Sequence, residues 1–298
     1  MQITIGSRGS DLALWQAHFV QDKLESLGHK VTIKIIVTKG DRIQDLSFDK
    51  IEGKGFFTKE IEDALLNKEI DLAVHSHKDL ETTNPEGLII GAVSYRENPT
   101  DQLLIRKSAA DVTAPLKLKK NALIGTSSAR RKSQLKRVQP DIQLKDLRGN
   151  VPTRINKLRN GDYDAIVLAS AGIKRLKIDL TDLETVELDP REFVPAPAQG
   201  VLGLQIRKTD TELQQVLANL NHPEVKVAIE IERDVLRLLE GGCQLPLGVY
   251  AETTENGWQI NVSYASSSDS AAVNSTYTVK ELGNIAEKIV ADLKGETH

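Results

Sequence analysis

Short apolar segments alternate with longer segments of helical period along most of the chain, and this alternation constrains the fold more than any other feature. The apolar segments have the length of buried strands, and the segments between them space their apolar residues as an amphipathic helix does. Strands are predicted at residues 2–5, 31–37, 71–75, 88–93, 122–125, 164–169 and 201–206, and a long polar loop at residues 38–55. Such alternation predicts an open α/β sheet that binds ligands at the carboxyl ends of its strands.

The chain has 298 residues, which is too long for one ordinary hydrophobic core. Residues 95–101 and 192–200 contain prolines and interrupt the alternation, so we interpret them as two crossings between lobes. This predicts a first α/β lobe of residues 1–97 plus 201–218 and a second α/β lobe of residues 98–200. A small α+β domain is predicted at residues 219–298, and two crossings are typical of a hinged pair of lobes.

The charge balance argues against a general nucleic-acid binding protein, because 39 basic side chains stand against 42 acidic ones. The single cysteine, Cys243, excludes an internal disulfide and any zinc site with several cysteines. We expect no bound metal. A free thiol suits a reducing compartment, and the first residues do not resemble a signal peptide. With no apolar run long enough for a membrane span, we expect a cytoplasmic protein.

Arginines follow several of the predicted strands. Arg8 lies in a glycine-containing turn before a helix that Ser10 can cap, and backbone N–H groups at such a helix start attract anions. Arg130 and Arg131 lie in the first turn of another predicted helix, where the helix dipole disfavours cations. Several arginines at strand ends suit a ligand with several carboxylates or phosphates. The alternatives are solvated turns or an RNA-binding patch, although few aromatic residues lie nearby to stack bases.

Two further sequence features indicate residues that could bind a ligand or react with one. Lys78 and Asp79 directly follow a buried strand, where they form either a ligand site or a surface salt bridge. Cys243 follows two glycines and precedes Pro246, a setting that suits an exposed thiol at a loop tip. The competing interpretation of Cys243 is a small buried apolar residue.

Taken together, the motifs resemble those of the porphobilinogen deaminase, or hydroxymethylbilane synthase, family. The matching segments, in family order and over nearly the whole chain, are residues 5–10 (IGSRGS), 12–17 (LALWQA), 53–57 (GKGFF), 71–76 (DLAVHS), 78–79 (KD), 125–128 (GTSS), 130–131 (RR), 147–151 (LRGNV), 153–154 (TR), 163–166 (YDAI), 171–172 (AG), 199–200 (QG) and 241–243 (GGC).

The resemblance implies two lobes like those of periplasmic binding proteins, with mixed sheets, plus a third domain that carries the cysteine. It implies a transferase of tetrapyrrole (haem) biosynthesis that condenses four porphobilinogen molecules head to tail, with release of ammonia, into hydroxymethylbilane. The chain grows on a dipyrromethane cofactor joined by a thioether to Cys243. We further expect a monomer, which passes its product to uroporphyrinogen-III synthase and has no nucleic-acid or membrane partner.

The resemblance also implies roles for individual residues, and metal ligands are not among them. Asp79 corresponds to the catalytic carboxylate. The residues expected to hold the cofactor are Cys243, Lys78, Asp79, Thr126, Ser128, Arg130, Arg131, Arg148 and Gly172. Those expected to bind the substrate are Arg8, Ser10, Lys54, Arg148, Arg154 and Gln199.

The sequence departs from the family pattern at a few positions. His77 stands in place of a usual methionine, Ala129 in place of a leucine, and Ala198 near a common glycine, while residues 80–81 (LE) replace Val-Pro. We expect His77 to serve packing and not proton transfer. A non-catalytic two-lobe protein that binds polycarboxylates is the alternative to the enzyme, and Asp79 together with Cys243 favours the enzyme.

Overall fold

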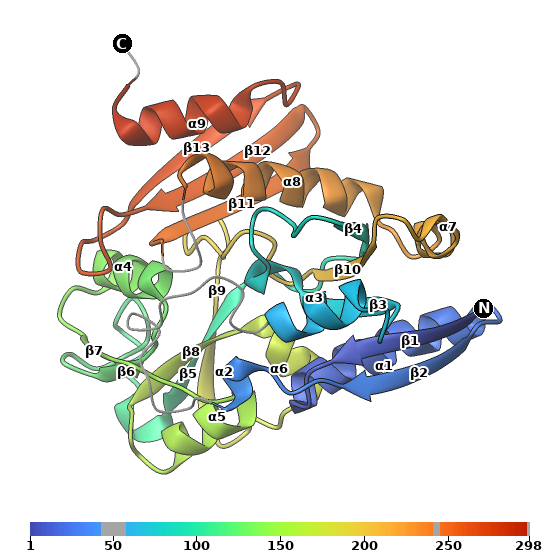
Figure 1. The fold of residues 1–298 in the computed structure, drawn as a ribbon. Helices are drawn as coiled ribbons and strands as arrows, with labels where there is room; N and C mark the ends of the chain where they lie inside the picture. Colours follow the sequence, from blue (N-terminus) through green and yellow to red (C-terminus); the bar gives the residue numbers. More distant parts are fainter. Residues whose placement is uncertain (43–57, 241–244, 297–298) are drawn as a thin grey trace. The chain divides into compact units, whose positions relative to one another are not determined.

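The computed structural model describes residues 1–42, 58–240 and 245–296 (Figure 1). The chain divides into two compact units. The first contains Met1–Glu97 and Gly200–Val227, and the second contains Asn98–Gln199 and Ala228–His298. Each unit is therefore built from segments far apart in the sequence.

A five-stranded mixed sheet forms the centre of the first unit. Its strands are β1 (Gln2–Ser7), β2 (Lys30–Ile35), β3 (Leu72–Ser76), β4 (Leu88–Val93) and β10 (Leu202–Arg207). The order is β2-β1-β3-β10-β4, with β1 parallel to β2 and β3, and β10 antiparallel to both of its neighbours. The returning strand predicted at residues 201–206 is thus confirmed as β10.

The helices of this unit are α1 (Asp11–Ser26), α2 (Lys39–Arg42), α3 (Lys59–Leu66), the 3-10 helix η2 (His77–Asp79) and α7 (Thr211–Ala218). Apolar residues of α1, α3 and α7 pack on the sheet in two buried clusters. Ser10 caps α1 by accepting a hydrogen bond from the Ala13 N–H, and Gly28 follows the helix at a φ of +85°. The helix starts where the sequence predicts it.

The second unit contains a sheet of the same design. Its strands are β5 (Asp101–Arg106), β6 (Leu123–Gly125), β7 (Gln143–Lys145), β8 (Ala165–Ala169) and β9 (Leu183–Leu188). They lie in the order β7-β6-β8-β5-β9, and β5 is antiparallel to both of its neighbours. Position by position, β6 corresponds to β1, β8 to β3 and β5 to β10. The helices are α4 (Ala129–Val138), α5 (Val151–Arg159), α6 (Ser170–Leu176) and the 3-10 helix η3 (Lys107–Ala109).

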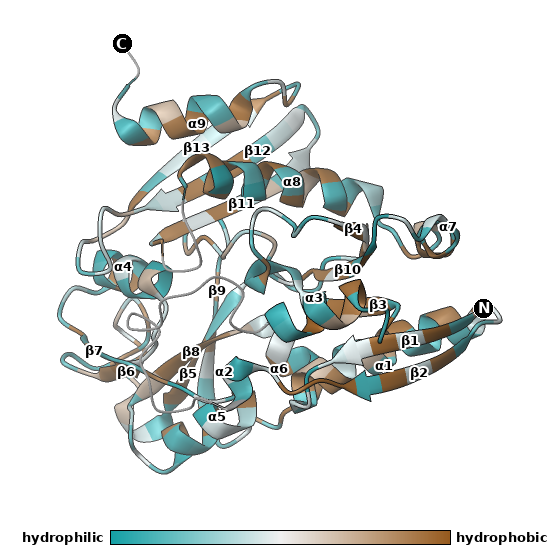
Figure 2. Ribbon diagram, in the orientation of Figure 1, coloured by the Kyte–Doolittle hydropathy of each residue, from teal (hydrophilic) through white to brown (hydrophobic). Residues whose placement is uncertain are grey.

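The end of the chain forms a small α+β part. Strands β11 (Leu247–Thr254), β12 (Gly257–Tyr264) and β13 (Val273–Val279) make an antiparallel sheet, beside which lie α8 (Pro223–Leu238) and α9 (Ile285–Lys294). In Figure 2 the strands β1 and β8 are mainly hydrophobic and α4 is mainly hydrophilic. This is the pattern expected of buried central strands and of a helix rich in charged residues.

The expected fold class, mixed α/β with a small α+β part at the end of the chain, is confirmed. Strands β5 and β9 were not predicted, and α2 lies in a stretch predicted to be a loop. The division into three domains stays a prediction. None of the helices in the described ranges is long and apolar enough to cross a bilayer.

Candidate active site

In the first unit, the predicted binding and catalytic residues lie at one edge of the sheet. Arg8 and Ser10 follow β1, and Lys78 and Asp79 form the end of η2, which follows β3. Because β1 and β3 are parallel neighbours, their carboxyl ends lie at the same edge. The Gln16 Nε2 group on α1 donates to the Ser76 Oγ at 2.8 Å and joins α1 to the end of β3.

Arg8 forms an ion pair with Asp41 on α2. The Arg8 Nε donates to Asp41 Oδ1 at 3.1 Å, and the two side chains remain 29% and 26% exposed. The N–H and hydroxyl of Thr38 also donate to Asp41. Burial by itself would raise the pKa of Asp41, but the hydrogen bonds from Arg8 and Thr38 hold it below its ordinary value. Arg8 is therefore held in place by a partner that water still reaches.

Asp79 is exposed at the end of η2, whereas the neighbouring His77 is 4% exposed. The His77 N–H donates to the Val201 carbonyl at 2.9 Å. Its ring lies against Gly203 of β10, so closely that a Cβ there would be 3.1 Å from the His77 Cδ2. These contacts fix the backbone from which Asp79 projects, and they support a packing role for His77.

In the second unit, three helices begin at the carboxyl ends of neighbouring parallel strands: α4 follows β6, α5 follows β7 and α6 follows β8. Ser128 caps α4 by accepting from the Arg131 N–H, and the Thr126 hydroxyl accepts from the Ser128 N–H at 3.2 Å. Gly172 is buried in the first turn of α6. The first N–H groups of a helix have no acceptor within that helix, so this edge of the sheet is rich in backbone donors.

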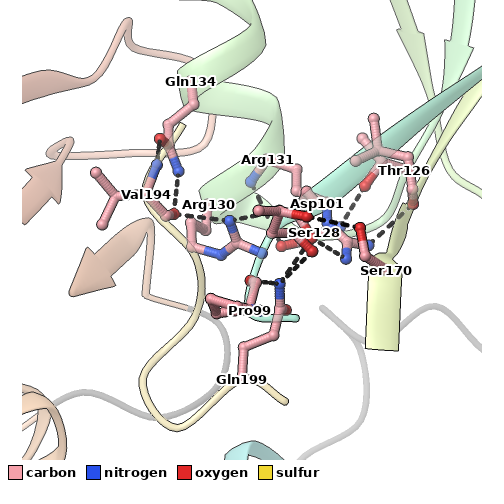
Figure 3. Close-up of polar contacts among 12 residues, drawn as sticks. Pro99, Asp101, Thr126, Ser128, Arg130, Arg131, Gln134, Ser170, Val194 and Gln199 are labelled. Carbon is pink, nitrogen blue, oxygen red and sulfur yellow. Dashed lines mark hydrogen bonds and ion pairs between the residues drawn. The ribbon is translucent and has the colours of Figure 1, made fainter. Parts of the chain in front are cut away.

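Arg130 and Arg131 are buried, being 5% and 7% exposed, and they share the carboxylate of Asp101 at the start of β5 (Figure 3). The Arg131 Nη2 donates to Asp101 Oδ1 at 2.7 Å, and the Arg130 Nη1 lies 2.8 Å from Asp101 Oδ2. Each guanidinium also donates to a backbone carbonyl, Val194 for Arg130 and Val167 for Arg131. The cost of placing cations at a helix start is therefore offset by a buried counter-ion.

The charges in this cluster do not cancel, because one carboxylate faces two guanidinium groups. Burial opposes the charge on Asp101, but both arginines outweigh it and hold its pKa far below the ordinary value. Burial and the neighbouring Arg131 lower the pKa of Arg130 despite the attraction of Asp101. The Arg131 Nε, also buried, has no hydrogen-bond partner in the described part of the chain. A net positive charge and a spare donor fit a carboxylate ligand.

Arg148 and Arg154 flank the start of α5 and are both half-buried. The Arg154 Nε donates to the Gly149 carbonyl at 2.7 Å, which turns this side chain back along the loop. Gly149 has a φ of +113°, and a Cβ there would lie 2.7 Å from Thr153, so only glycine fits. The Asn150 side chain caps α5 by accepting from the Thr153 N–H at 2.9 Å.

Gln199 lies in the second crossing and is fully buried. Its Nε2 donates to the Pro99 carbonyl at 2.8 Å and to Asp101 Oδ1 at 3.0 Å, and so joins the two crossings. The preceding Ala198 has a φ of +62°, which explains why glycine is expected near this position. The Ala198 N–H donates to the Glu232 Oε2 at 2.7 Å, a bond that stabilises this backbone conformation.

Two predicted residues, Lys54 and Cys243, lie outside the described residues. Several partners were missed in the sequence: Asp101 and Asp41, which pair with the arginines, and Gln134, which exchanges two hydrogen bonds with the Val194 backbone. The only signal for Asp101 was its place as an acidic residue at the head of the apolar segment that forms β5.

These observations first define the class. The chain is a mixed α/β protein with two sheets of one topology, and cationic side chains lie at the carboxyl ends of the parallel strands in each. Among solved structures it is similar to an ancestral cationic amino acid solute binding protein, with a TM-score of 0.43 and 16% identity over 76% of this chain and 89% of that one. It is also similar to the probable amino-acid ABC transporter extracellular-binding protein ytmK from Bacillus subtilis, with a TM-score of 0.44 and 11% identity over 74% and 90%.

Sequence comparison then identifies the family. Residues 3–215 match the family model "Porphobilinogen deaminase, dipyromethane cofactor binding domain", and residues 226–292 match "Porphobilinogen deaminase, C-terminal domain". The porphobilinogen deaminase of Nitratiruptor sp. is 48% identical over 260 residues, which are 86% of this chain and 80% of the relative. The porphobilinogen deaminase of Syntrophobacter fumaroxidans is 45% identical over 85% of this chain and 81% of the relative. The chain therefore belongs to the porphobilinogen deaminase family, as its motifs predict.

Proposed function

We propose that this chain is an enzyme that condenses four porphobilinogen molecules head to tail into hydroxymethylbilane and releases ammonia. Membership of the porphobilinogen deaminase family over both matched segments carries this conclusion. The placement of an exposed acidic residue and several arginines at the carboxyl ends of parallel strands supports it. Pyrroles with acetate and propionate arms are polyanions, so their binding calls for many guanidinium donors.

The buried arginine cluster fits the dipyrromethane cofactor. Arg130 and Arg131 keep one positive charge in excess over Asp101, and the Arg131 Nε remains without a partner in the described ranges. In the proposed role these arginines hold carboxylates of the cofactor, assisted by Lys78, Thr126, Ser128, Arg148 and Gly172, while Cys243 anchors it by a thioether. When bound, dipyrromethane supplies the nucleophilic pyrrole carbon to which the first substrate is joined.

The more accessible arginines are proposed to bind the carboxylates of the substrate. Arg8 and Arg154 are each oriented by a hydrogen bond to the protein and remain partly exposed, so a carboxylate in solution can reach them. Ser10, Lys54 and Arg148 belong to the same proposed set. Gln199 is the buried member of that set, and its side chain bonds to Asp101. Because guanidinium groups stay charged near neutral pH, binding through them does not depend on pH in the working range.

Asp79 is the proposed catalytic residue. Its carboxylate accepts a hydrogen bond from the pyrrole N–H of the substrate as the protonated amine leaves as ammonia. The ring then carries a developing positive charge, which a nearby carboxylate stabilises. After coupling, an Asp79 oxygen can accept the proton that the nucleophilic pyrrole carbon releases. The contacts of His77 with β10 keep the backbone at Asp79 in place for both roles.

Replacement of Asp79 by asparagine tests this assignment. We expect Asp79→Asn to lower turnover by about 10²-fold or more, because the neutral amide no longer stabilises the cationic ring. Intact-protein mass will show that the cofactor is still attached. Glu86→Gln is the matched control, since it neutralises an exposed carboxylate a few residues away, and it should leave the rate unchanged. Full activity of Asp79→Asn contradicts the role.

The same mass measurement separates the enzyme from a polycarboxylate-binding protein without catalysis. The enzyme carries the extra mass of two linked pyrroles, and Cys243→Ala loses it. A wild-type chain that binds porphobilinogen, has no extra mass and does not turn over would favour the binding protein. We further propose a cytoplasmic monomer whose product passes to uroporphyrinogen-III synthase. Light scattering tests the monomer, and fractionation tests the location.

A further inference from the structure

Asp101 is the residue that connects the buried polar side chains around Arg130 and Arg131 in the second unit. It is fully buried at the start of β5, where the first crossing ends. Three side chains from two other segments converge on its carboxylate: Arg130 and Arg131 from α4, and Gln199 from the second crossing. The position of both arginines therefore depends on this one carboxylate.

The contacts fix the orientation of both arginines. On Arg131, Asp101 and the Val167 carbonyl each accept from a different Nη atom, so the guanidinium plane cannot rotate without breaking a bond. On Arg130, Asp101 and the Val194 carbonyl both face Nη1, which turns the rest of that guanidinium away from them. A guanidinium that is held at one side presents its remaining donors in a fixed direction.

A purely structural role accounts poorly for this arrangement. A buried ion cluster loses much solvation, and apolar side chains of similar volume often give equal or greater stability. Here the cluster also keeps an uncompensated positive charge, and the Arg131 Nε is left without a hydrogen-bond partner in the described residues. Stability alone favours neither feature, whereas a resident anionic ligand removes both costs.

We propose that Asp101 is a positioning residue, which orients Arg130 and Arg131 and so determines whether the second unit can retain its dipyrromethane cofactor. This inference rests on the proposed function and adds to it a residue that does not itself touch the ligand. Asp101 also offsets half of the arginine charge, which leaves the cluster matched to one carboxylate instead of two. Gln199 supports Asp101 from the second crossing through its bond to the same oxygen that binds Arg131.

Cofactor occupancy of Asp101→Asn tests the proposal. The amide keeps the size of the side chain but removes its charge, and its NH₂ group would oppose one guanidinium. We expect the fraction of chains that carry the extra mass of two pyrroles to fall about tenfold or more, as for the loss of one partner from a buried charged pair. The measurement uses the full-length protein as purified, with intact mass as the readout.

A second variant separates positioning from lost stability. Leu135 lies on the same helix as the two arginines and is fully buried. Leu135→Ala should therefore lower stability without changing a polar contact of Asp101. We expect it to retain the cofactor even where its melting temperature falls as far as that of Asp101→Asn. Equal loss of cofactor in both variants overturns the proposal, because folding alone would then explain the effect.

Asp101→Glu covers the case in which the asparagine variant does not fold. Glutamate keeps the negative charge and moves it by one methylene, so occupancy should be partly restored relative to asparagine. Occupancy equal to wild type in both Asp101 variants rejects the inference. If the wild-type protein itself carries no extra mass, the proposed function has failed and not the role of Asp101.

Discussion

The same position in two similar sheets holds arginines in two different ways. In the first unit, Arg8 follows β1 and pairs with Asp41, and both side chains are more than a quarter exposed. In the second unit, Arg130 and Arg131 follow the corresponding strand β6 and pair with Asp101, and all three are buried. The topology is shared, so burial of the counter-ion is what distinguishes the two sites.

The difference matters for what each site can bind. An exposed ion pair contributes little to stability, and a ligand carboxylate can replace its partner at low cost. A buried pair is not exchanged in this way, because separating it leaves an unpaired charge away from water. A site of the first kind suits a substrate that arrives and leaves, and one of the second kind suits a group that stays.

The largest expected effect is on folding stability, and it compares loss of the buried counter-ion with loss of the exposed one. Asp101→Asn should lower the free energy of unfolding by about 3–5 kcal/mol, whereas Asp41→Asn should lower it by about 1 kcal/mol or less. The pKa of Asp101 is depressed in the folded protein, so its contribution is present above its ordinary value of 3.8 and is lost as the pH falls below it. Urea unfolding near neutral pH compares the variants. Similar losses in both would remove the distinction between the two sites.

The next largest effect is a loss of folding stability at acid pH, and it is expected from His75 on β3 of the first unit. Its Nε2 donates to Gln205 Oε1 at 3.1 Å, and the Gln205 Nε2 donates to Glu62. Burial lowers the pKa of His75 from 6.5 to about 4, although the bond to Gln205 opposes this shift.

The unfolded chain therefore binds a proton on His75 at pH values where the folded chain does not. Stability contributed by the neutral ring is complete above about pH 6.5 and falls by about 3 kcal/mol as the pH drops toward 4. In His75→Gln this loss should be absent. Unfolding experiments at a series of pH values give the slope of the free energy of unfolding against pH for the wild type and for His75→Gln. Equal slopes in the two proteins would show that His75 does not titrate as proposed. Asp101, in contrast, stays charged throughout this window.

The smallest effect on stability is expected at Arg8. Arg8→Gln removes a partly exposed ion pair, so the free energy of unfolding should change by less than about 1 kcal/mol. Loss of a charged hydrogen bond to a substrate carboxylate should nevertheless raise KM by about tenfold, with cofactor occupancy unchanged. The matched control is Arg159→Gln on α5, which breaks an exposed ion pair with Asp182 and should leave KM unchanged. A KM unaffected by Arg8→Gln would remove Arg8 from the substrate site.

Much of the local structure could be predicted. The cap at Ser10, the helix whose first turn holds Arg130 and Arg131, and the returning strand β10 follow from residue preferences and apolar spacing, which act over a few positions. Strand β5 was missed, because it follows a crossing and its place between β8 and β9 depends on partners far along the chain. Its first residue, Asp101, was missed with it.

The sequence by itself determined the class of fold, the family, and the residue types placed at the strand ends, since motifs and periodicity are local. Only the tertiary structure decided which arginine has which counter-ion and how much water reaches each pair. Asp101 and Arg131 are 30 positions apart, and they meet because β5 lies beside β8 while α4 begins after β6. The strength of a charge pair depends on its surroundings, and those surroundings are assembled only when distant segments pack together.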